Sequence, residues 1–142
     1  MIKKILFLCL FGITTLGFSQ ENLPFAMMKN APVYPDCKGD AAQLKECTAE
    51  KIEDFIRTNF NTTIIDELAL GQKQKRVTFQ FTISRAGYVE GIRIKSADVL
   101  LDAEGERVIA SLPKMKPGTH RGKAKGTLYF LSIDFGKKKK KA

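Results

Sequence analysis

The clearest pattern in the chain is a strict alternation of apolar and polar residues over positions 76–84. A period of two places successive side chains on opposite faces of a β-strand. One face of this strand is therefore apolar, and the other carries hydroxyl and amide groups. The apolar face consists of Val77, Phe79, Phe81 and Ile83.

Two further strands are predicted. A short turn that ends in Gly87, a residue that readily adopts a positive φ, leads into a return strand over residues 88–95. Ile92 and Ile94 are expected to face the same side as the apolar residues of the first strand. The last strand is predicted over residues 126–135, and its inward side chains are Tyr129, Leu131, Ile133 and Phe135.

Two helices are predicted from apolar residues that lie three and four positions apart. The first covers about residues 48–59, with Thr48 as its N-cap and acidic residues in its first turn. The second begins at a cap formed by Asp102 and ends at about residue 112, before Pro113.

The expected fold is α+β, with the elements in the order α-β-β-α-β. A three-stranded antiparallel sheet with both helices on one face is the simplest layered arrangement of these elements. Gly105 lies in the apolar stripe of the second helix, which predicts a close approach to the sheet. Residues 64–70 are ambiguous, and their spacing suits one or two helical turns. A small sheet leaves unpaired N–H and C=O groups at its edges, and these can accept an added strand.

Composition and charge narrow the class of protein. The chain has 142 residues, of which 44% are hydrophobic and 27% charged, so one domain with a packed core is expected and wholesale disorder is excluded. The formal net charge is +9. Subtracting Lys3 and Lys4 leaves +7, and subtracting the five lysines at 137–141 leaves about +2 on the expected folded part. Because the excess positive charge lies mainly in a tail, no nucleic-acid partner is expected.

The start of the chain predicts a cleaved export signal. Lys3 and Lys4 form a basic start, residues 5–18 are mainly apolar, and Gly17 and Ser19 supply small residues at a cleavage site. The apolar run is short for a membrane span, and a retained anchor is the alternative. We therefore expect a periplasmic protein with a signal at 1–19, an entry segment at 20–31, a domain at 32–135 and a Lys-rich tail at 136–142.

Export changes the interpretation of the cysteines. Cys9 lies within the signal, so Cys37 and Cys47 remain, and an oxidising compartment favours a disulfide between them. Two unpaired thiols are the alternative. A zinc site is disfavoured because the one histidine, His120, is far from both in sequence. No metal and no cofactor are expected.

Catalytic patterns are weak in this sequence. His120 lies in a basic polar loop, and no glycine-rich phosphate loop follows a predicted strand. Glu104 and Glu106 are two positions apart, so they do not face each other on a helix. We expect a protein without enzymatic activity.

Several motifs, taken in order, resemble the TonB C-terminal-like domains of Bacteroidetes-type bacteria. Pro32-Val-Tyr-Pro-Asp-Cys37 and the helix end Asn59-Phe60-Asn61-Thr62 are similar to the opening part of that family. The most specific stretch is 101–118, which resembles the second helix of the family and the Pro-Lys-Met-Lys-Pro-Gly turn after it. Leu131-Ser-Ile-Asp-Phe135 resembles the closing strand, so the resemblance covers residues 32–135.

The chain also departs from this family. Gly105 stands where the family usually has alanine, and Ser132 and Asp134 stand where proline and a small or amide residue are common. Fewer than fifteen residues separate the signal from Pro32, and they span about 50 Å when fully extended. The resemblance therefore implies the binding domain of the family without its membrane anchor and Pro-rich spacer.

The resemblance implies binding by strand addition, in which an edge strand pairs with an extended segment of an outer-membrane receptor or another envelope protein. The last strand is the candidate edge, with Leu128 and Phe130 facing away from the helices. Packing of these two side chains under the entry segment and a homodimer formed through the same edges are alternatives. The residues expected to bind the partner are Gly126, Thr127, Leu128, Tyr129, Phe130, Leu131 and Ser132.

A second hypothesis is a stand-alone structural or self-associating envelope protein without a role in transport. It would use the tail lysines, Lys137 to Lys141, for a weak contact with an anionic envelope surface, and salt would weaken that contact. A solvated tail that aids solubility is the simpler interpretation of the same residues.

Overall fold

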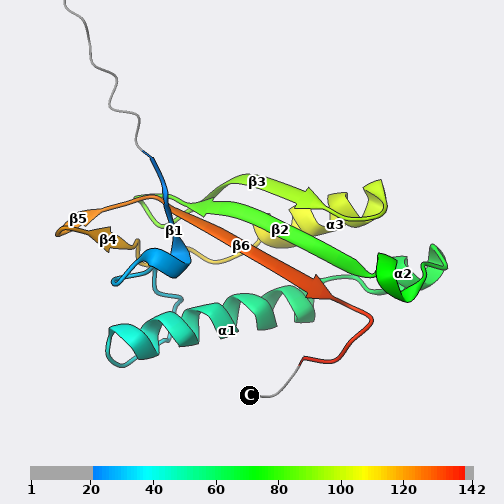
Figure 1. Ribbon diagram of the computed structural model, residues 1–142, viewed down its shortest axis with the longest axis horizontal. Coiled ribbons are helices and arrows are strands. Elements are labelled where there is room, and N and C mark those ends of the chain that lie inside the picture. The colour runs from blue at the N-terminus through cyan, green and yellow to red at the C-terminus, as the bar shows by residue number, and fades with distance from the viewer. Residues whose placement is uncertain (1–20, 140–142) are drawn as a thin grey trace, which may run out of the picture.

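The computed structural model describes residues 21–139. The predicted signal and the end of the Lys-rich tail lie outside the described residues. The elements in chain order are β1 (Leu23–Pro24), the 3-10 helix η1 (Phe25–Met27), α1 (Ala41–Asn59), α2 (Thr63–Glu67), the 3-10 helix η2 (Gln72–Gln74), β2 (Arg76–Ile83), β3 (Val89–Lys95), α3 (Val99–Ala110), β4 (Thr119–His120), β5 (Lys123–Ala124) and β6 (Thr127–Asp134) (Figure 1).

Four of the strands form one mixed sheet in the order β1-β6-β2-β3. β2 pairs antiparallel with both β3 and β6, while β1 pairs in parallel with β6. The α+β class is confirmed, but the expectation of a three-stranded antiparallel sheet is wrong, because β1 adds a fourth, parallel strand. β1 escaped prediction since it has two residues, one of them a proline, and shows no alternation.

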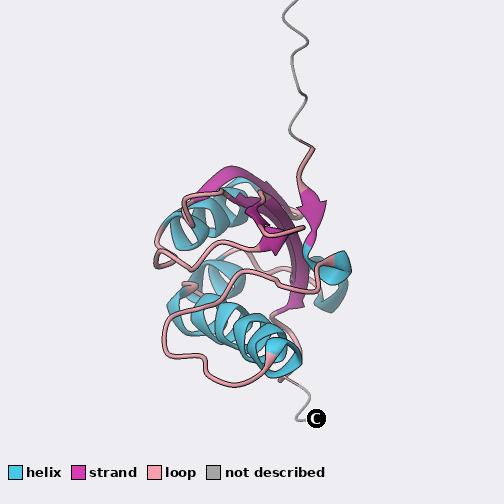
Figure 2. Ribbon diagram, turned by 90° about the vertical axis from the view of Figure 1, so that its left-hand side faces the viewer, coloured by secondary structure: helices cyan, strands magenta, loops and turns pink. Residues whose placement is uncertain are grey.

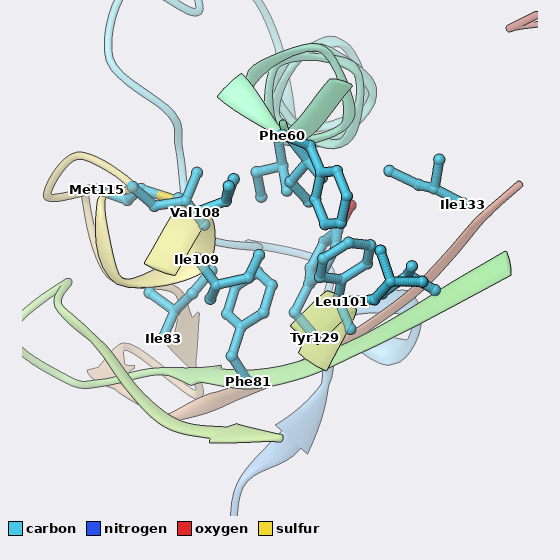
Figure 3. Close-up of a cluster of buried hydrophobic side chains, with 14 of the residues drawn as sticks. Phe60, Phe81, Ile83, Leu101, Val108, Ile109, Met115, Tyr129 and Ile133 are labelled. Atoms are coloured by element: carbon cyan, nitrogen blue, oxygen red, sulfur yellow. The ribbon is translucent and has the colours of Figure 1, made fainter. Parts of the chain in front are cut away.

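The apolar face of the sheet is covered by α1 and α3 (Figure 2). The four apolar side chains that alternate along β2 are all fully buried, as the pattern predicts. Phe81 stacks on Tyr129 of β6 with ring centroids 5.2 Å apart, and the edge of Phe60 meets Phe79. Figure 3 shows how Leu101, Val108 and Ile109 of α3 complete this core.

The sequence predicts that the first helix starts at Thr48, but α1 begins seven residues earlier, at Ala41. Asp40 and Gln43 form a capping box, in which each side chain accepts a hydrogen bond of 2.9 Å from the backbone N–H of the other. Thr48 is buried in the middle of the helix, and its Oγ1 accepts a hydrogen bond of 3.0 Å from the N–H of Tyr34. The hydroxyl therefore ties the preceding loop to α1 instead of capping a helix.

α3 also begins earlier than predicted, at Val99, because Asp98 and not Asp102 is the N-cap. The Asp98 side chain accepts a hydrogen bond of 2.8 Å from the N–H of Leu100. The predicted close approach of Gly105 is confirmed, since a Cβ atom there would lie 2.8 Å from Cγ2 of Ile94.

Two smaller predictions are also settled. Gly87 has a φ of +86°, as the predicted hairpin turn requires. The ambiguous stretch at 64–70 contains most of the short helix α2, and Ile65 is buried in the core.

Candidate strand-docking edge

The outer side of β6 is covered by β1 over only part of its length. Leu23 lies beside Thr127 and Pro24 beside Leu128, and the N–H of Leu23 donates a hydrogen bond of 3.0 Å to the carbonyl of Gly126. No strand continues this pairing within the part of the chain that the structure describes. The outer side of β6 is therefore free of a neighbouring strand from Tyr129 onward.

The direction of the unpaired backbone groups follows from this contact. In an extended strand the N–H and C=O of one residue point to the same side, and successive residues alternate. Because the carbonyl of Gly126 faces β1, the backbone groups of Phe130 and Ser132 face outward on the same side. No backbone hydrogen bond satisfies these outward groups within residues 21–139. They form the candidate strand-docking edge.

The predicted binding residues therefore divide into two groups. Gly126, Thr127 and Leu128 lie where β1 already occupies the edge, so the expectation that this whole stretch is an open edge is corrected for these three. At the start of this stretch Asn22 lies close to Gly126, where a Cβ atom would meet the Oδ1 atom of Asn22. The second group of predicted binding residues lies on the uncovered part of β6 and consists of Tyr129, Phe130, Leu131 and Ser132.

β1 ends where the chain turns into the 3-10 helix η1 directly after Pro24. Leu23 carries the backbone groups that face β6, so those of Pro24 point away from it. The ammonium group of Lys45 on α1 holds that turn, because its Nζ donates to the carbonyls of Ala26 and Met28 at 2.7 and 3.0 Å. Fixing η1 in this way keeps the entry segment from extending further along β6.

The solvent-facing side of the sheet next to this edge is polar apart from Leu128 and the aromatic ring of Phe130. Phe130 lies opposite Gln80 and is 65% exposed. Ser132 lies opposite Thr78, and their hydroxyl oxygens are 2.8 Å apart. Leu128 is half-buried and pairs with Pro24 of β1, whereas no strand lies beside Phe130 on this side. Phe130 is thus available to an incoming side chain.

On the inner side of the edge, Tyr129 lies between aromatic rings and a carboxylate. Phe25 of η1 meets the Tyr129 ring edge-on at 4.8 Å, and burial together with the charge of Glu53 raises the pKa of Tyr129 to about 12. Glu53 is paired with Arg57 at 2.8 Å along α1. The phenol therefore stays protonated over the whole physiological range and acts as a packing residue of the edge.

One lysine of the tail, Lys139, contacts α1. Lys139 Nζ lies 2.7 Å from a carboxylate oxygen of Asp54, and this hydrogen bond, helped by Glu53 and Glu50, raises the pKa of Lys139. Both partners are partly exposed, so the pair contributes little to stability. It shows that the solvent-facing side of α1 near its middle is acidic.

The opposite edge of the sheet is β3, which has a different character. Gly91 has a φ of +60° and lies in a bulge that shifts the register between Gln80 and Thr82. The exposed residues Glu90, Arg93 and Lys95 follow one another along the strand. Bulges and charges are the usual devices that prevent an edge from pairing with another chain. β6 is therefore the better candidate for strand addition.

The predicted disulfide is present. Cys37 and Cys47 are bonded, with their Cα atoms 5.9 Å apart, and they join the loop before α1 to the helix itself. The two other cysteine interpretations, free thiols and a metal site, are thereby set aside for this pair. A disulfide is compatible with export from the cytoplasm.

His120 lies in β4 on an exposed hairpin, beside Arg121 and Lys123. Within residues 21–139, no three His, Cys, Asp or Glu side chains are grouped so that they could hold a metal ion.

Sequence reasoning missed β1, η1 and the hairpin of β4 and β5. The Asp40 and Gln43 pair has the three-residue spacing of a capping box and was visible in the sequence. Leu23 and Pro24 gave no such signal, since their pairing with β6 depends on a contact more than a hundred positions away.

The chain was compared with protein-family models, with curated proteins and with solved structures, and no match was found. A search of the helices within residues 21–139 found none with the length and apolar character needed to cross a membrane.

Proposed function

We propose that this protein is a periplasmic binding module that adds an extended segment of an outer-membrane or other envelope protein to the outer edge of β6. The observation that carries the proposal is that the outward N–H and C=O groups of Phe130 and Ser132 are unsatisfied, next to a short strand of the same chain that already uses this edge. β1 is thus an internal example of the proposed interaction.

The edge offers both sources of binding energy that strand addition requires. Backbone hydrogen bonds to Phe130 and Ser132 would supply affinity irrespective of sequence. Alternate side chains of the bound segment would lie against the exposed ring of Phe130 on one face and near the acidic side of α1 on the other. Selectivity would come from these side chains.

The ordered motifs that resemble TonB C-terminal-like domains support the same proposal, because strand addition is what that resemblance implies. A link to TonB-type transport belongs to the proposal and rests on the resemblance. Binding without catalysis is the function proposed.

Calorimetry with synthetic peptides from the N-terminal segments of outer-membrane receptors tests the proposal. Ser132→Pro removes one outward N–H, whereas the matched control Ser132→Ala removes only the hydroxyl that contacts Thr78. We expect Ser132→Pro to weaken binding at least about tenfold, since a lost backbone hydrogen bond and a blocked strand both act against the peptide. Ser132→Ala is expected to bind like the wild type.

Several results would count against the proposal. It fails if no receptor peptide binds and the amide spectrum of β6 does not change, or if both variants bind as the wild type does. A concentration-dependent dimer that Ser132→Pro abolishes would assign the edge to a second copy of the chain instead.

A further inference from the structure

The small net charge of the folded part conceals an uneven distribution. Between Glu106 and Asp134 the sequence contains no acidic residue. The same stretch carries the basic residues Arg107, Lys114, Lys116, Arg121, Lys123 and Lys125, together with His120. Most of these residues follow α3 in the sequence. Four of them, His120, Arg121, Lys123 and Lys125, lie near Arg85, at the end of the sheet where β2 turns into β3.

A short hairpin presents several of these charges. β4 and β5 pair antiparallel, with His120 beside Lys123. The turn between them consists of Arg121 and Gly122, which have φ values of +53° and +77° and therefore form the tight turn that two-residue hairpins favour. Arg121, Lys123 and His120 are exposed. In Figure 1 the hairpin projects beyond the end of the main sheet.

The hairpin faces a further cation from the turn between β2 and β3. Arg85 and the hairpin residues His120, Arg121, Lys123 and Lys125 line one shallow cavity of about 350 Å³. None of these basic side chains forms an ion pair within residues 21–139. An acidic residue, Glu90, lies close to this group in an adjoining cavity that Arg85 also lines. Like charges held together without counterions favour an anionic ligand.

The same turn carries an amphipathic aromatic residue. Tyr88 is 57% exposed, and the ammonium group of Lys114 lies 5.1 Å above its ring. A tyrosine ring beside basic side chains is typical of protein surfaces that meet the headgroup layer of a membrane. A soluble polyanion offers no apolar layer in which such a ring could be buried.

The first residues that the structure describes also lie at this end. Asn22 and Gly126 line the adjoining cavity together with Arg85.

We propose that this basic end, formed by Arg85 and the β4–β5 hairpin, docks on the anionic phospholipid headgroups of a membrane surface. The interaction is separate from strand addition, because β6 carries its open edge further along the sheet, beyond the part that β1 covers. A protein held in this way would keep the edge of β6 accessible at the membrane surface.

Sedimentation with lipid vesicles tests this proposal, using the chain purified after export. The probe is a vesicle of equal parts phosphatidylglycerol and phosphatidylethanolamine, and pure phosphatidylcholine is the uncharged comparison. The hairpin variant is Arg121→Gln/Lys123→Gln/Lys125→Gln. The matched control is Lys51→Gln/Lys73→Gln/Lys95→Gln, which removes the same charge from exposed positions on α1, η2 and β3. A third variant replaces the tail lysines at 137–141 with glutamine.

The hairpin variant is expected to bind the anionic vesicles about a hundredfold more weakly, since each basic residue near an anionic leaflet strengthens binding several-fold. The control and tail variants are expected to retain most of the binding, and added salt should weaken binding in every variant. Circular dichroism shows whether each variant is folded.

Three results would overturn the proposal. The first is wild-type binding to anionic vesicles that is no stronger than binding to phosphatidylcholine. The second is loss of binding in the tail or control variant while the hairpin variant binds normally. The third is hairpin-dependent binding of heparin, used as a soluble polyanion, without binding to vesicles.

Discussion

The two edges of the main sheet, β3 and β6, differ in how far they are protected against pairing with another chain. The β3 edge is interrupted by a bulge at Gly91, and the charged side chains of Glu90, Arg93 and Lys95 follow along it. The β6 edge has no charged residue between Thr127 and Ile133, and a two-residue strand from the same chain covers only its start.

This difference indicates that one edge is closed permanently and the other only in part. A bulge and a row of charges belong to the strand itself, so no partner can remove them. β1, by contrast, is joined to β6 by few hydrogen bonds and can be extended by another chain that continues along the same side. The edge that the fold leaves open is therefore the edge at which we propose that a segment of another protein binds.

The helices beneath the two edges are also held differently. α1 is fastened to the preceding loop by the disulfide between Cys37 and Cys47. α3 is docked by the close approach of Gly105 to Ile94 of β3 and Phe79 of β2. Perturbing each attachment should therefore affect the two sides of the sheet unequally.

Reduction of the disulfide is expected to have the largest effect. Opening a ring of this size lowers the free energy of unfolding by about 3 kcal/mol. Denaturant unfolding with and without a reductant measures the loss, and hydrogen exchange should increase in α1 before it increases in α3. The variant Cys37→Ser/Cys47→Ser should be insensitive to the reductant. Equal acceleration of exchange in both helices would argue against a separate attachment of α1.

Gly105→Leu should disturb the β3 side instead. A large side chain at this position meets Cγ2 of Ile94 and the ring of Phe79, and overpacking of this kind costs about 2 kcal/mol. Gly105→Ala is the matched control, because the smaller clash is offset by about 1 kcal/mol of helix propensity. Thermal or denaturant unfolding decides between them. If Leu and Ala are tolerated alike, α3 does not depend on close contact at this point.

Glu104 links the end of α1 to α3, and its loss should have a smaller effect. Its carboxylate accepts hydrogen bonds from the Arg107 guanidinium at 2.6 and 2.8 Å and from the N–H of Asn61 at 2.8 Å. The bond from Arg107, followed by that from Asn61, holds the pKa of Glu104 below its ordinary value of 4.5 against the opposing effect of burial. Glu104→Gln should therefore lower the free energy of unfolding by about 1 kcal/mol at neutral pH.

The lowered pKa of Glu104 also predicts how the difference in stability between the wild type and Glu104→Gln depends on pH. Because the folded pKa is lower than the unfolded one, the carboxylate stabilises the fold above pH 4.5, and this stabilisation is lost as the pH falls through the folded value. The wild type and Glu104→Gln should thus converge in acid. Glu106→Gln, which removes an exposed carboxylate from the same helix, is the matched control for the loss of one negative charge from α3. A difference between wild type and Glu104→Gln that stays constant down to strong acid would contradict the assignment.

The smallest effect is expected from weakening β1. Leu23→Gly/Pro24→Gly should loosen the entry segment, lower the free energy of unfolding by at most about 1 kcal/mol and lengthen the accessible edge of β6. A receptor peptide that binds this edge should then bind a few-fold more tightly, as calorimetry can measure. Weaker binding in this variant would mean that β1 helps to form the site rather than limiting it.

Local patterns in the sequence predicted the main strands and much of both long helices. Alternation over 76–84 gave the buried face of β2 correctly, and Gly87 and Gly105 were correctly linked to a turn and a close contact. Helix starts were placed too late because apolar periodicity begins after the cap. At both helices the true cap was an aspartate, Asp40 or Asp98, that lies outside the apolar stripe.

The candidate site was predicted only in part, for a different reason. The identity of β6 and the outward direction of Phe130 follow from alternation along the strand. Which neighbour covers each side of β6 depends on contacts between distant segments, such as Asn22 and Leu23 with Gly126. The basic end likewise brings together Arg85 and a hairpin that is distant in sequence, which the net charge of the chain could not reveal.

Amide hydrogen exchange along β6 tests the central claim most directly, with and without a bound receptor peptide. In the free protein, the N–H groups of Phe130 and Ser132 should exchange rapidly, while those of Tyr129, Leu131 and Ile133, which face β2, should be protected. Addition of the peptide should slow exchange at Phe130 and Ser132 and leave β3 unchanged. Strong protection of Phe130 and Ser132 in the free monomer, or protection that appears along β3 instead, would contradict the account.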